Sequence, residues 1–330
     1  MSAKSQETAI HILLESLLMT LVVARQVNNE VYIVGDTKFT GPLDSVWSES
    51  RKYIGGLKVV LLTPGLCVGF AGNVEIARDA IQGVYDEDVN LFDKNHAIEH
   101  FLKHHRHSME KSSTTDFIIA GIVECYEQPG TFLKEIFRIA DSKVYWENET
   151  THIGDRDAFN CFQEDFHHGS QKQNVPTFEV SKLGTKERPA FNQALSAAMH
   201  AMQGVIDNPK VLSVDGIRTV VISEEDQFKY VEYLQIRGTP LPVRNEPGAP
   251  VSFGDAAEGS DHKHVGMFAA VGHGIFPVYS ITGHFGLIYH PEECFEPTII
   301  RNCTQEEFRV RVEERISVAH QRALTYQTRL

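Results

Sequence analysis

The feature that most constrains the fold is a pair of short apolar runs, Thr20–Arg25 and Glu30–Gly35. The segment between them, QVNNE, carries an Asn-Asn pair, which is a turn signal for a two-stranded hairpin. A Met-Thr pair opens the first run, and an Asp36-Thr37-Lys38-Phe39-Thr40 string follows the second. The sequence therefore predicts an antiparallel hairpin with polar, chemically useful residues at its open end.

The elements that follow alternate between groups of strands and pairs of helices. Apolar periodicity and turn residues predict strands at Lys58–Leu62, Leu66–Phe70, Asp116–Val123, Phe132–Ala140, Lys143–Trp146, Thr219–Ile222 and Tyr230–Ile236. Helical spacing predicts helices at Val74–Val84 (N-cap Asn73), His96–Lys111, Asp157–Phe166 and Pro189–Ile206. Paired helices between runs of antiparallel strands favour a layered α+β fold over a βαβ chain.

Composition divides the chain into four parts. Residues 1–19 are an N-terminal extension in which Ala9–Leu18 has helical periodicity. Residues 20–236 form the main predicted domain, residues 237–263 are a Pro/Gly-rich linker or loop, and residues 264–330 are a C-terminal extension. The extension is expected to contain further strands and a closing helix at Thr304–Leu324, with Thr304 and Glu307 in a capping-box arrangement.

Charge and cysteine usage exclude several classes of protein. The formal charge of −13 disfavours nucleic acid and anionic membranes as partners. The five cysteines are widely spaced without a CxxC motif, which argues against a disulfide framework or a zinc ribbon and favours a reduced, cytoplasmic protein. His100 and His104 stand one helical turn apart and could share a metal, but a solvated basic helix end is the preferred interpretation. We expect no metal and no cofactor.

The region from Thr20 to Gly72 resembles the proteasome β-subunit family of N-terminal nucleophile (Ntn) hydrolases, which includes bacterial proteasome-like peptidases. The residues that match the family's spacings are Thr20, Asp36, Lys38, Thr40, Lys58, Pro64, Ala71 and Gly72. Looser likeness continues in DFIIAGIVE, THIGDRDAF and LSVDGIRTVVIS, as far as Ile236. The resemblance implies a four-layer αββα sandwich.

The resemblance also implies roles for particular residues. Thr20 would be the nucleophile and its own free α-amine the base. Asp36 and Lys58 would tune and stabilise the site, and the Gly72 N–H would be an oxyanion donor. Around these groups, the substrate would contact Lys38, Phe39, Thr40, Phe70 and Val74. Of these, Thr40 would bind an extended peptide through its backbone, and Phe39, Phe70 and Val74 would make the specificity pocket apolar.

Three positions depart from the pattern of catalytic members. Asp155 stands where they have a Ser, and Val211 and Val214 stand where they have an Asp and a Ser. Those family residues normally help to hold the active-site water and the terminal amine. The departures therefore bear on catalysis more than on fold.

Two main functions remain open beside other Ntn chemistry, such as that of an acylase or amidase, and the N-terminus discriminates between the two. If translation starts at Met19, or if residues 1–19 are a propeptide, Thr20 becomes the first residue of a threonine peptidase or amide hydrolase. If residues 1–19 stay as a packing helix, the chain is a noncatalytic ring or scaffold subunit, because Thr20 then lacks a free amine. The resemblance implies a homo-oligomer, peptide or unfolded-protein substrates, and a partner ATPase as a further option.

Overall fold

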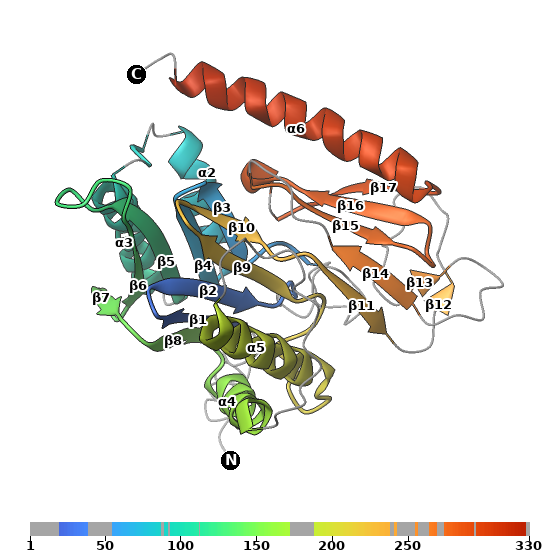
Figure 1. Cartoon of the computed structure of the whole chain (residues 1–330), viewed down its shortest axis with the longest axis horizontal. Coiled ribbons are helices and arrows are strands. Elements are labelled where there is room, and N and C mark those ends of the chain that lie inside the picture. Colours follow the sequence, from blue (N-terminus) through green and yellow to red (C-terminus); the bar gives the residue numbers. More distant parts are fainter. Residues whose placement is uncertain are drawn as a thin grey trace, which may run out of the picture.

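The computed structural model describes residues 20–38, 55–86, 89–91, 93–111, 113–171, 188–237, 241–242, 255–256, 264–268, 274–293 and 295–327. In this part of the chain the protein is an α+β structure of helices and mostly antiparallel sheets (Figure 1). None of the helices described is long and apolar enough to cross a membrane.

The predicted hairpin is confirmed and lies in the middle of the first sheet. Strands β1 (Leu21–Val27) and β2 (Glu30–Gly35) pair in antiparallel register, with Val27 opposite Glu30. Both turn residues, Asn28 and Asn29, have positive φ values of 50° and 61°. That conformation is the one a two-residue type I′ turn requires and Asn tolerates, so the local sequence sets the register.

The first sheet has the strand order β10-β9-β2-β1-β8. Its remaining strands are β8 (Thr150–Gly154), β9 (Thr219–Glu224) and β10 (Gln227–Tyr230). The sequence did not predict β8, and the strand predicted at Tyr230–Ile236 is divided between β10 and β11 (Tyr233–Arg237). β11 leaves the first sheet and pairs with β14 (His264–Phe268).

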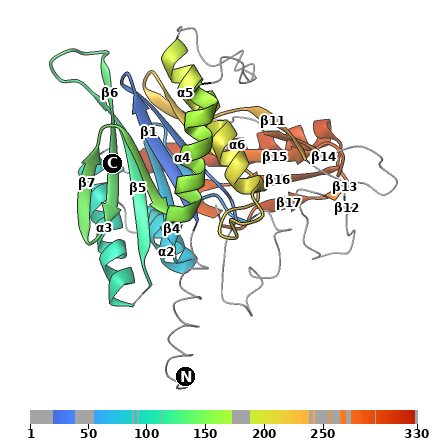
Figure 2. The ribbon, with the colours of Figure 1, turned by 90° about the horizontal axis from the view of Figure 1, so that it is seen from below.

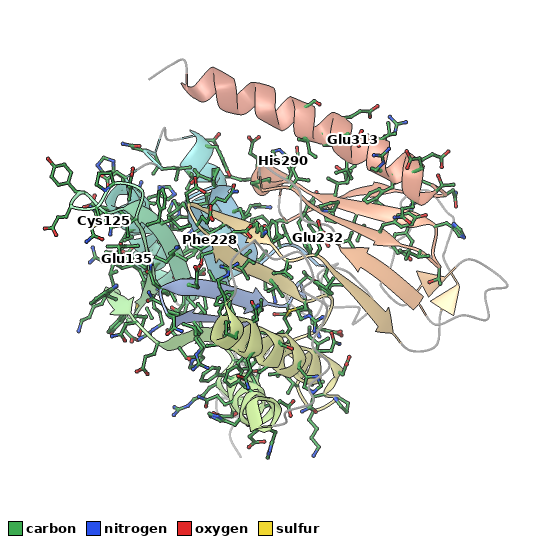
Figure 3. All side chains as sticks on the ribbon, viewed as in Figure 1. Cys125, Glu135, Phe228, Glu232, His290 and Glu313 are labelled. Atoms are coloured by element: carbon green, nitrogen blue, oxygen red, sulfur yellow. The ribbon has the colours of Figure 1, made fainter. Side chains whose placement is uncertain are left out.

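The second sheet is an antiparallel meander with strand order β3-β4-β5-β6-β7. Its strands are β3 (Val59–Thr63), β4 (Leu66–Gly72), β5 (Thr115–Glu124), β6 (Phe132–Ala140) and β7 (Lys143–Glu147). It faces the first sheet: a side chain on Gly69 would meet Val22 of β1. Phe228, labelled in Figure 3, is 3% exposed, and its N–H joins the sheets by donating to the Pro64 carbonyl at 2.6 Å.

Two pairs of helices cover the outer faces of these sheets (Figures 1 and 2). Helices α4 (Arg156–Gln171) and α5 (Pro189–Asp207) pack against each other and against β1 and β2. Helices α2 (Val74–Asp86) and α3 (Lys94–Glu110) lie on β4, β5 and β6. The predicted N-cap of α2 is confirmed, because the Asn73 side chain accepts from the Glu75 and Ile76 N–H groups at 2.9 and 3.1 Å.

The interpretation of α3 as a solvated basic helix end is wrong for two of its histidines. His100 and His105 are 6% and 0% exposed. His100 Nε2 lies 2.8 Å from the Ala80 carbonyl, and His105 Nδ1 donates to the Thr115 carbonyl at 2.8 Å. His105 Nε2 accepts from the Ser142 N–H at 2.9 Å, so this ring is neutral. Buried polar groups need such partners, and the backbone carbonyls provide them.

A third sheet lies at the side of the first two and has the order β11-β14-β15-β16-β17. Its later strands are β15 (Phe276–Ser280), β16 (Phe285–Tyr289) and β17 (Thr298–Ile300), with a short 3-10 helix η1 (Pro291–Glu293) before β17. Helix α6 (Gln305–Gln327) lies along this sheet (Figure 1). The predicted capping box is confirmed. The Glu307 carboxylate accepts from the Thr304 N–H at 2.7 Å, and the Glu307 backbone N–H donates to the Thr304 hydroxyl at 3.2 Å. Two-residue strands β12 (Leu241–Pro242) and β13 (Asp255–Ala256) form a separate pair.

Candidate active site

The open end of the hairpin brings Thr20, Asp36 and Lys58 together. Thr20 immediately precedes β1 and Asp36 immediately follows β2, so antiparallel pairing places them at the same end of the hairpin. Lys58 stands just before β3 in the facing sheet. The three residues are 5%, 0% and 2% exposed, so they form a buried polar cluster between the sheets.

Direct contacts join all three side chains. The Thr20 hydroxyl donates to Asp36 Oδ1 at 2.6 Å. The Lys58 ammonium donates to Asp36 Oδ1 and Oδ2 at 3.0 and 2.9 Å, and it also contacts the Thr20 hydroxyl oxygen. A hydroxyl held between a carboxylate and an ammonium is fixed in position and close to a positive charge, which is an arrangement suited to nucleophilic chemistry.

Asp36 is also held by the backbone. Its Oδ2 accepts the N–H groups of Lys38 and Asp215 at 3.0 and 3.3 Å, and its Oδ1 accepts that of Leu21 at 3.4 Å. These donors come from three separate segments of the chain. The carboxylate is therefore rigidly oriented towards Thr20 and Lys58.

Two opposing effects act on the pKa of Lys58. Burial lowers the pKa of its ammonium below the usual value, because a charged group in a low-dielectric interior is disfavoured. The Asp36 carboxylate raises the pKa and so opposes the burial. An ammonium in this setting loses a proton more readily than a lysine on the surface does.

Gly154 brings β8 against the carbonyl of Thr20. Its φ is +99°, and a side chain there would overlap the Thr20 carbonyl oxygen and come within 3.2 Å of Ala71 Cβ. The next residue, Asp155, donates its N–H to the Thr20 carbonyl at 2.7 Å. The ends of β4 and β8 therefore meet beside Thr20, with Gly72 following directly after Ala71.

Two polar residues that the sequence analysis missed, Ser213 and Asp215, lie close to the cluster. Val211 and Val214 were matched to the family's polar positions, but both contribute to the core. Their neighbours Ser213 and Asp215 approach the site: the Ser213 hydroxyl donates to Asp155 Oδ2, and the Asp215 N–H donates to Asp36. The signal lies in the string LSVDG, where Ser and Asp occur in the order opposite to that of the family.

Asp155 itself has a structural explanation. Its Oδ1 accepts the N–H groups of Asp157 and Ala158 at 2.8 and 3.1 Å, which caps the first turn of α4. Asp155 thus bonds to the first turn of α4, to the Ser213 hydroxyl and to the Thr20 carbonyl, and it holds these three groups close together.

Three of the five predicted substrate residues, Lys38, Phe70 and Val74, lie within the described part of the chain. Phe70 is 1% exposed, and Val74 is partly buried at the start of α2. Lys38 is partly buried and its ammonium donates to the Leu212 carbonyl at 2.6 Å. Phe39, Thr40 and residues 1–19 lie outside the described residues.

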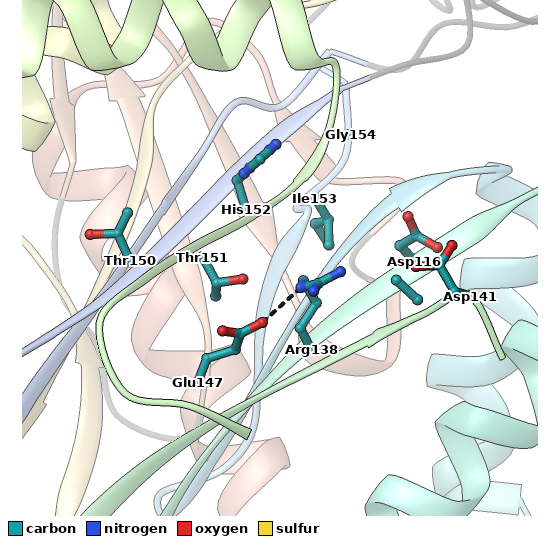
Figure 4. Close-up of a pocket in the computed structure, with 10 residues that line it drawn as sticks. Asp116, Arg138, Asp141, Glu147, Thr150, Thr151, His152, Ile153 and Gly154 are labelled. Atoms are coloured by element: carbon teal, nitrogen blue, oxygen red, sulfur yellow. Dashed lines mark hydrogen bonds and ion pairs between the residues drawn. The ribbon is translucent and has the colours of Figure 1, made fainter. Parts of the chain in front are cut away.

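A polar pocket of about 450 Å³ opens between the edges of the sheets, next to Gly154 (Figure 4). Its lining residues are Asp116, Arg138, Ala140, Asp141, Glu147, Thr150, Thr151, His152, Ile153 and Gly154. Arg138 Nε donates to Glu147 at 2.8 Å, drawn as a dashed line in Figure 4.

Burial shifts the pKa values of two ionisable groups in this polar pocket. It raises the pKa of Asp116 to about 6, assisted by the nearby Asp141 charge. Burial also lowers the pKa of His152 to about 4, and its ring stacks on Phe159 at 3.6 Å. Asp116 therefore titrates close to neutral pH, while His152 is uncharged there. Within the described residues, no three His, Cys, Asp or Glu side chains form a group that could hold a metal.

Comparison with known proteins shows distant similarity to solved structures. No protein-family model matches the sequence, and no curated protein matches it. Among solved structures, Anbu (ancestral beta-subunit) from Yersinia bercovieri is similar, with a TM-score of 0.39 and 13% sequence identity. The match covers 64% of this chain and 86% of that chain. Similarity at this level does not by itself indicate an activity.

Proposed function

We propose that this protein is a threonine-type Ntn hydrolase that cleaves amide bonds in peptides or unfolded proteins once Thr20 is its first residue. The observation that carries the proposal is the buried contact among the Thr20 hydroxyl, the Lys58 ammonium and the Asp36 carboxylate. The two facing sheets with a helix pair on each outer face agree with the four-layer αββα sandwich of such enzymes.

In the proposed reaction, the α-amine of Thr20 accepts the hydroxyl proton as the Thr20 Oγ attacks the substrate carbonyl. A free α-amine has a pKa of roughly 7.7–8.0, so it is a competent base near neutral pH. The Lys58 ammonium stabilises the negative charge that develops on the oxygen, and the Asp36 carboxylate opposes the effect of burial, which lowers the pKa of Lys58. The Gly72 N–H is our candidate donor to the oxyanion. The amine then transfers the proton to the leaving amine of the peptide, and water hydrolyses the ester formed on Thr20.

The second candidate is a noncatalytic scaffold subunit that keeps residues 1–19. Its specific support is the completeness of the hydrogen bonding around Thr20, which is 5% exposed and bonded through both its hydroxyl and its carbonyl. A threonine buried in this way also stabilises the junction of three chain segments without any chemistry.

The test compares proteins with different N-termini. The chain should be produced with Thr20 as its first residue, by cleavage of a removable N-terminal fusion, and compared with the chain beginning at Met1. We expect amide hydrolysis of fluorogenic peptides by the first protein alone. The Thr20→Ala variant in the same format should lose all activity, whereas Thr20→Ser should retain part of it. Hydrolysis that survives Thr20→Ala would rule out the mechanism. Absence of hydrolysis by the protein that begins at Thr20 would favour the noncatalytic scaffold subunit.

A further inference from the structure

Strand β7 leaves one edge of the second sheet open. Within the described residues β7 pairs only with β6, and it lies at the outer edge of the molecule in both views (Figures 1 and 2). The strand at the other edge of this sheet, β3, has the C-terminal part packed against it: η1 contacts β3, and a side chain on Gly274 would come within 2.7 Å of the Leu61 carbonyl oxygen. The backbone N–H and C=O groups that β7 turns away from β6 can therefore bond to a further strand.

β7 lacks several features that keep edge strands from pairing. Its five residues, KVYWE, contain no proline, and its register with β6 runs without the shift that a bulge would cause. Val144 and Trp146 are 36% and 67% exposed, although both side chains are large and apolar. They point to the same face of the sheet because they stand two residues apart. An exposed tryptophan beside an open edge favours an interaction surface.

The sequence of β7 is complementary to itself. When two β7 strands pair in antiparallel register centred on Tyr145, Lys143 of each copy stands opposite Glu147 of the other, and Val144 stands opposite Trp146. Opposite charges, and an aromatic residue facing a β-branched one, are favourable cross-strand pairs. Opposed residues in this register differ by an even number of positions. The backbone groups that point away from β6 in one copy therefore meet those of the other.

Both charged residues can take part in this pairing without giving up a contact. Lys143 is exposed and makes no ion pair in the part of the chain that the structure describes. Glu147 accepts from Arg138 Nε through Oε1, which leaves Oε2 as an acceptor for a second cation. Each Lys143 would therefore extend an existing Arg138–Glu147 ion pair of the other copy, at the border of the polar pocket that Glu147 lines.

We propose that two copies of this chain associate through their β7 strands, in antiparallel register about a two-fold axis at Tyr145. The second sheets of the two copies then form one continuous sheet of ten strands, since each copy contributes five. The Val144 and Trp146 side chains of both copies cluster on one face of this sheet, and the two Lys143–Glu147 pairs lie on the other. The interface uses the same surface on both copies, so it closes as a dimer. It is independent of the proposed hydrolase activity.

The first test is the oligomeric state of the full chain, measured by sedimentation equilibrium from about 1 to 100 μM protein. We expect a monomer–dimer equilibrium. Lys143→Glu should weaken the dimer by about tenfold or more, because like charges then face each other at both ends of the strand pair. Lys210→Glu is the matched control: Lys210 is also exposed, it makes the same change of charge, and it lies after α5, away from β7. The control should leave the dimer unchanged.

Cysteine cross-linking tests the register. Tyr145→Cys places two thiols directly opposite each other, with Cα atoms about 4.5–5.5 Å apart, which is within the range of a disulfide. Val144→Cys is the matched control, because the two copies of position 144 stand two residues out of register and beyond the disulfide limit of about 7 Å. With the wild-type chain as the baseline, we expect mild oxidation to give a covalent dimer of Tyr145→Cys alone.

Three results would each overturn the proposal. The first is a wild-type chain that stays monomeric over the whole concentration range. The second is an oligomer that Lys143→Glu and Lys210→Glu leave equally tight, since its interface would then lie elsewhere. The third is equal cross-linking of Tyr145→Cys and Val144→Cys, which would contradict the register.

Discussion

Gly154→Ala should destabilise the protein at the carbonyl of Thr20. The added methyl group would overlap the Thr20 carbonyl oxygen and lie 2.7 Å from its carbonyl carbon, so β8 must move away from β1. The φ of +99° adds strain of about 1–2 kcal/mol for a residue with a Cβ atom. Overpacking adds about 1–3 kcal/mol, and loss of the Asp155 N–H bond to Thr20 adds about 1 kcal/mol. We expect a total near 4 kcal/mol.

Gly130→Ala separates the strain from the overlap. Gly130 also has a positive φ, +83°, but nothing lies within 4 Å of the position of its added methyl group. Its substitution should therefore cost only the strain, about 1–2 kcal/mol. Urea denaturation of both variants gives the difference, provided that the m-value is unchanged. Equal midpoints for the two variants would refute the close approach of β8 to Thr20, and so would unchanged hydrogen exchange at the Asp155 N–H.

Three further changes test other parts of the structure. Lys58→Met leaves the Asp36 carboxylate buried without its cation and should cost about 3–5 kcal/mol by urea denaturation, whereas adding Asp36→Asn should recover part of that loss. Asp116→Asn should stabilise the protein above neutral pH: the folded pKa near 6 exceeds the unfolded value, so the acid form stabilises below pH 4 and this contribution is lost as the pH rises through 6. The difference between wild type and variant should therefore grow with pH to at most about 3 kcal/mol, and a flat difference would contradict the shift. Thr304→Ala removes the N-cap of α6 and should cost about 1 kcal/mol, with no change expected for Ser317→Ala in the exposed part of the same helix.

The elements that the sequence predicted well have local causes. Asn28 and Asn29 accept the positive φ values of the hairpin turn, Asn73 caps α2, and Thr304 with Glu307 caps α6. Each of these signals acts within a few residues, so it can be read without knowledge of the fold. Strand β8 was missed for the opposite reason: its sequence, TTHIG, holds a single large apolar residue, Ile153, and its pairing with β1 comes from across the chain.

The same distinction applies to the candidate site. The proximity of Thr20 and Asp36 could be predicted because they flank one hairpin, and that of Lys58 because it matches the spacing of a known family. Ser213 and Asp215 could not, because only the approach of the segment before β9 brings them to Asp155 and Asp36. His100 and His105 likewise looked solvated, since the backbone carbonyls that receive their N–H groups are distant in sequence.

The three residues of the buried cluster differ in how much a purely structural role explains. Asp36 accepts three backbone N–H groups, which is sufficient reason to keep a buried carboxylate at the junction of three segments. Lys58 joins the facing sheet to the hairpin through its contacts with Asp36 and Thr20, but a buried ion pair is often no more stabilising than apolar residues of the same volume. A scaffold could therefore replace Lys58 at little cost by changing its partner as well. A hydrolase could not, because it needs a positive charge beside the Thr20 hydroxyl. The presence of Lys58, more than that of Asp36, favours catalysis.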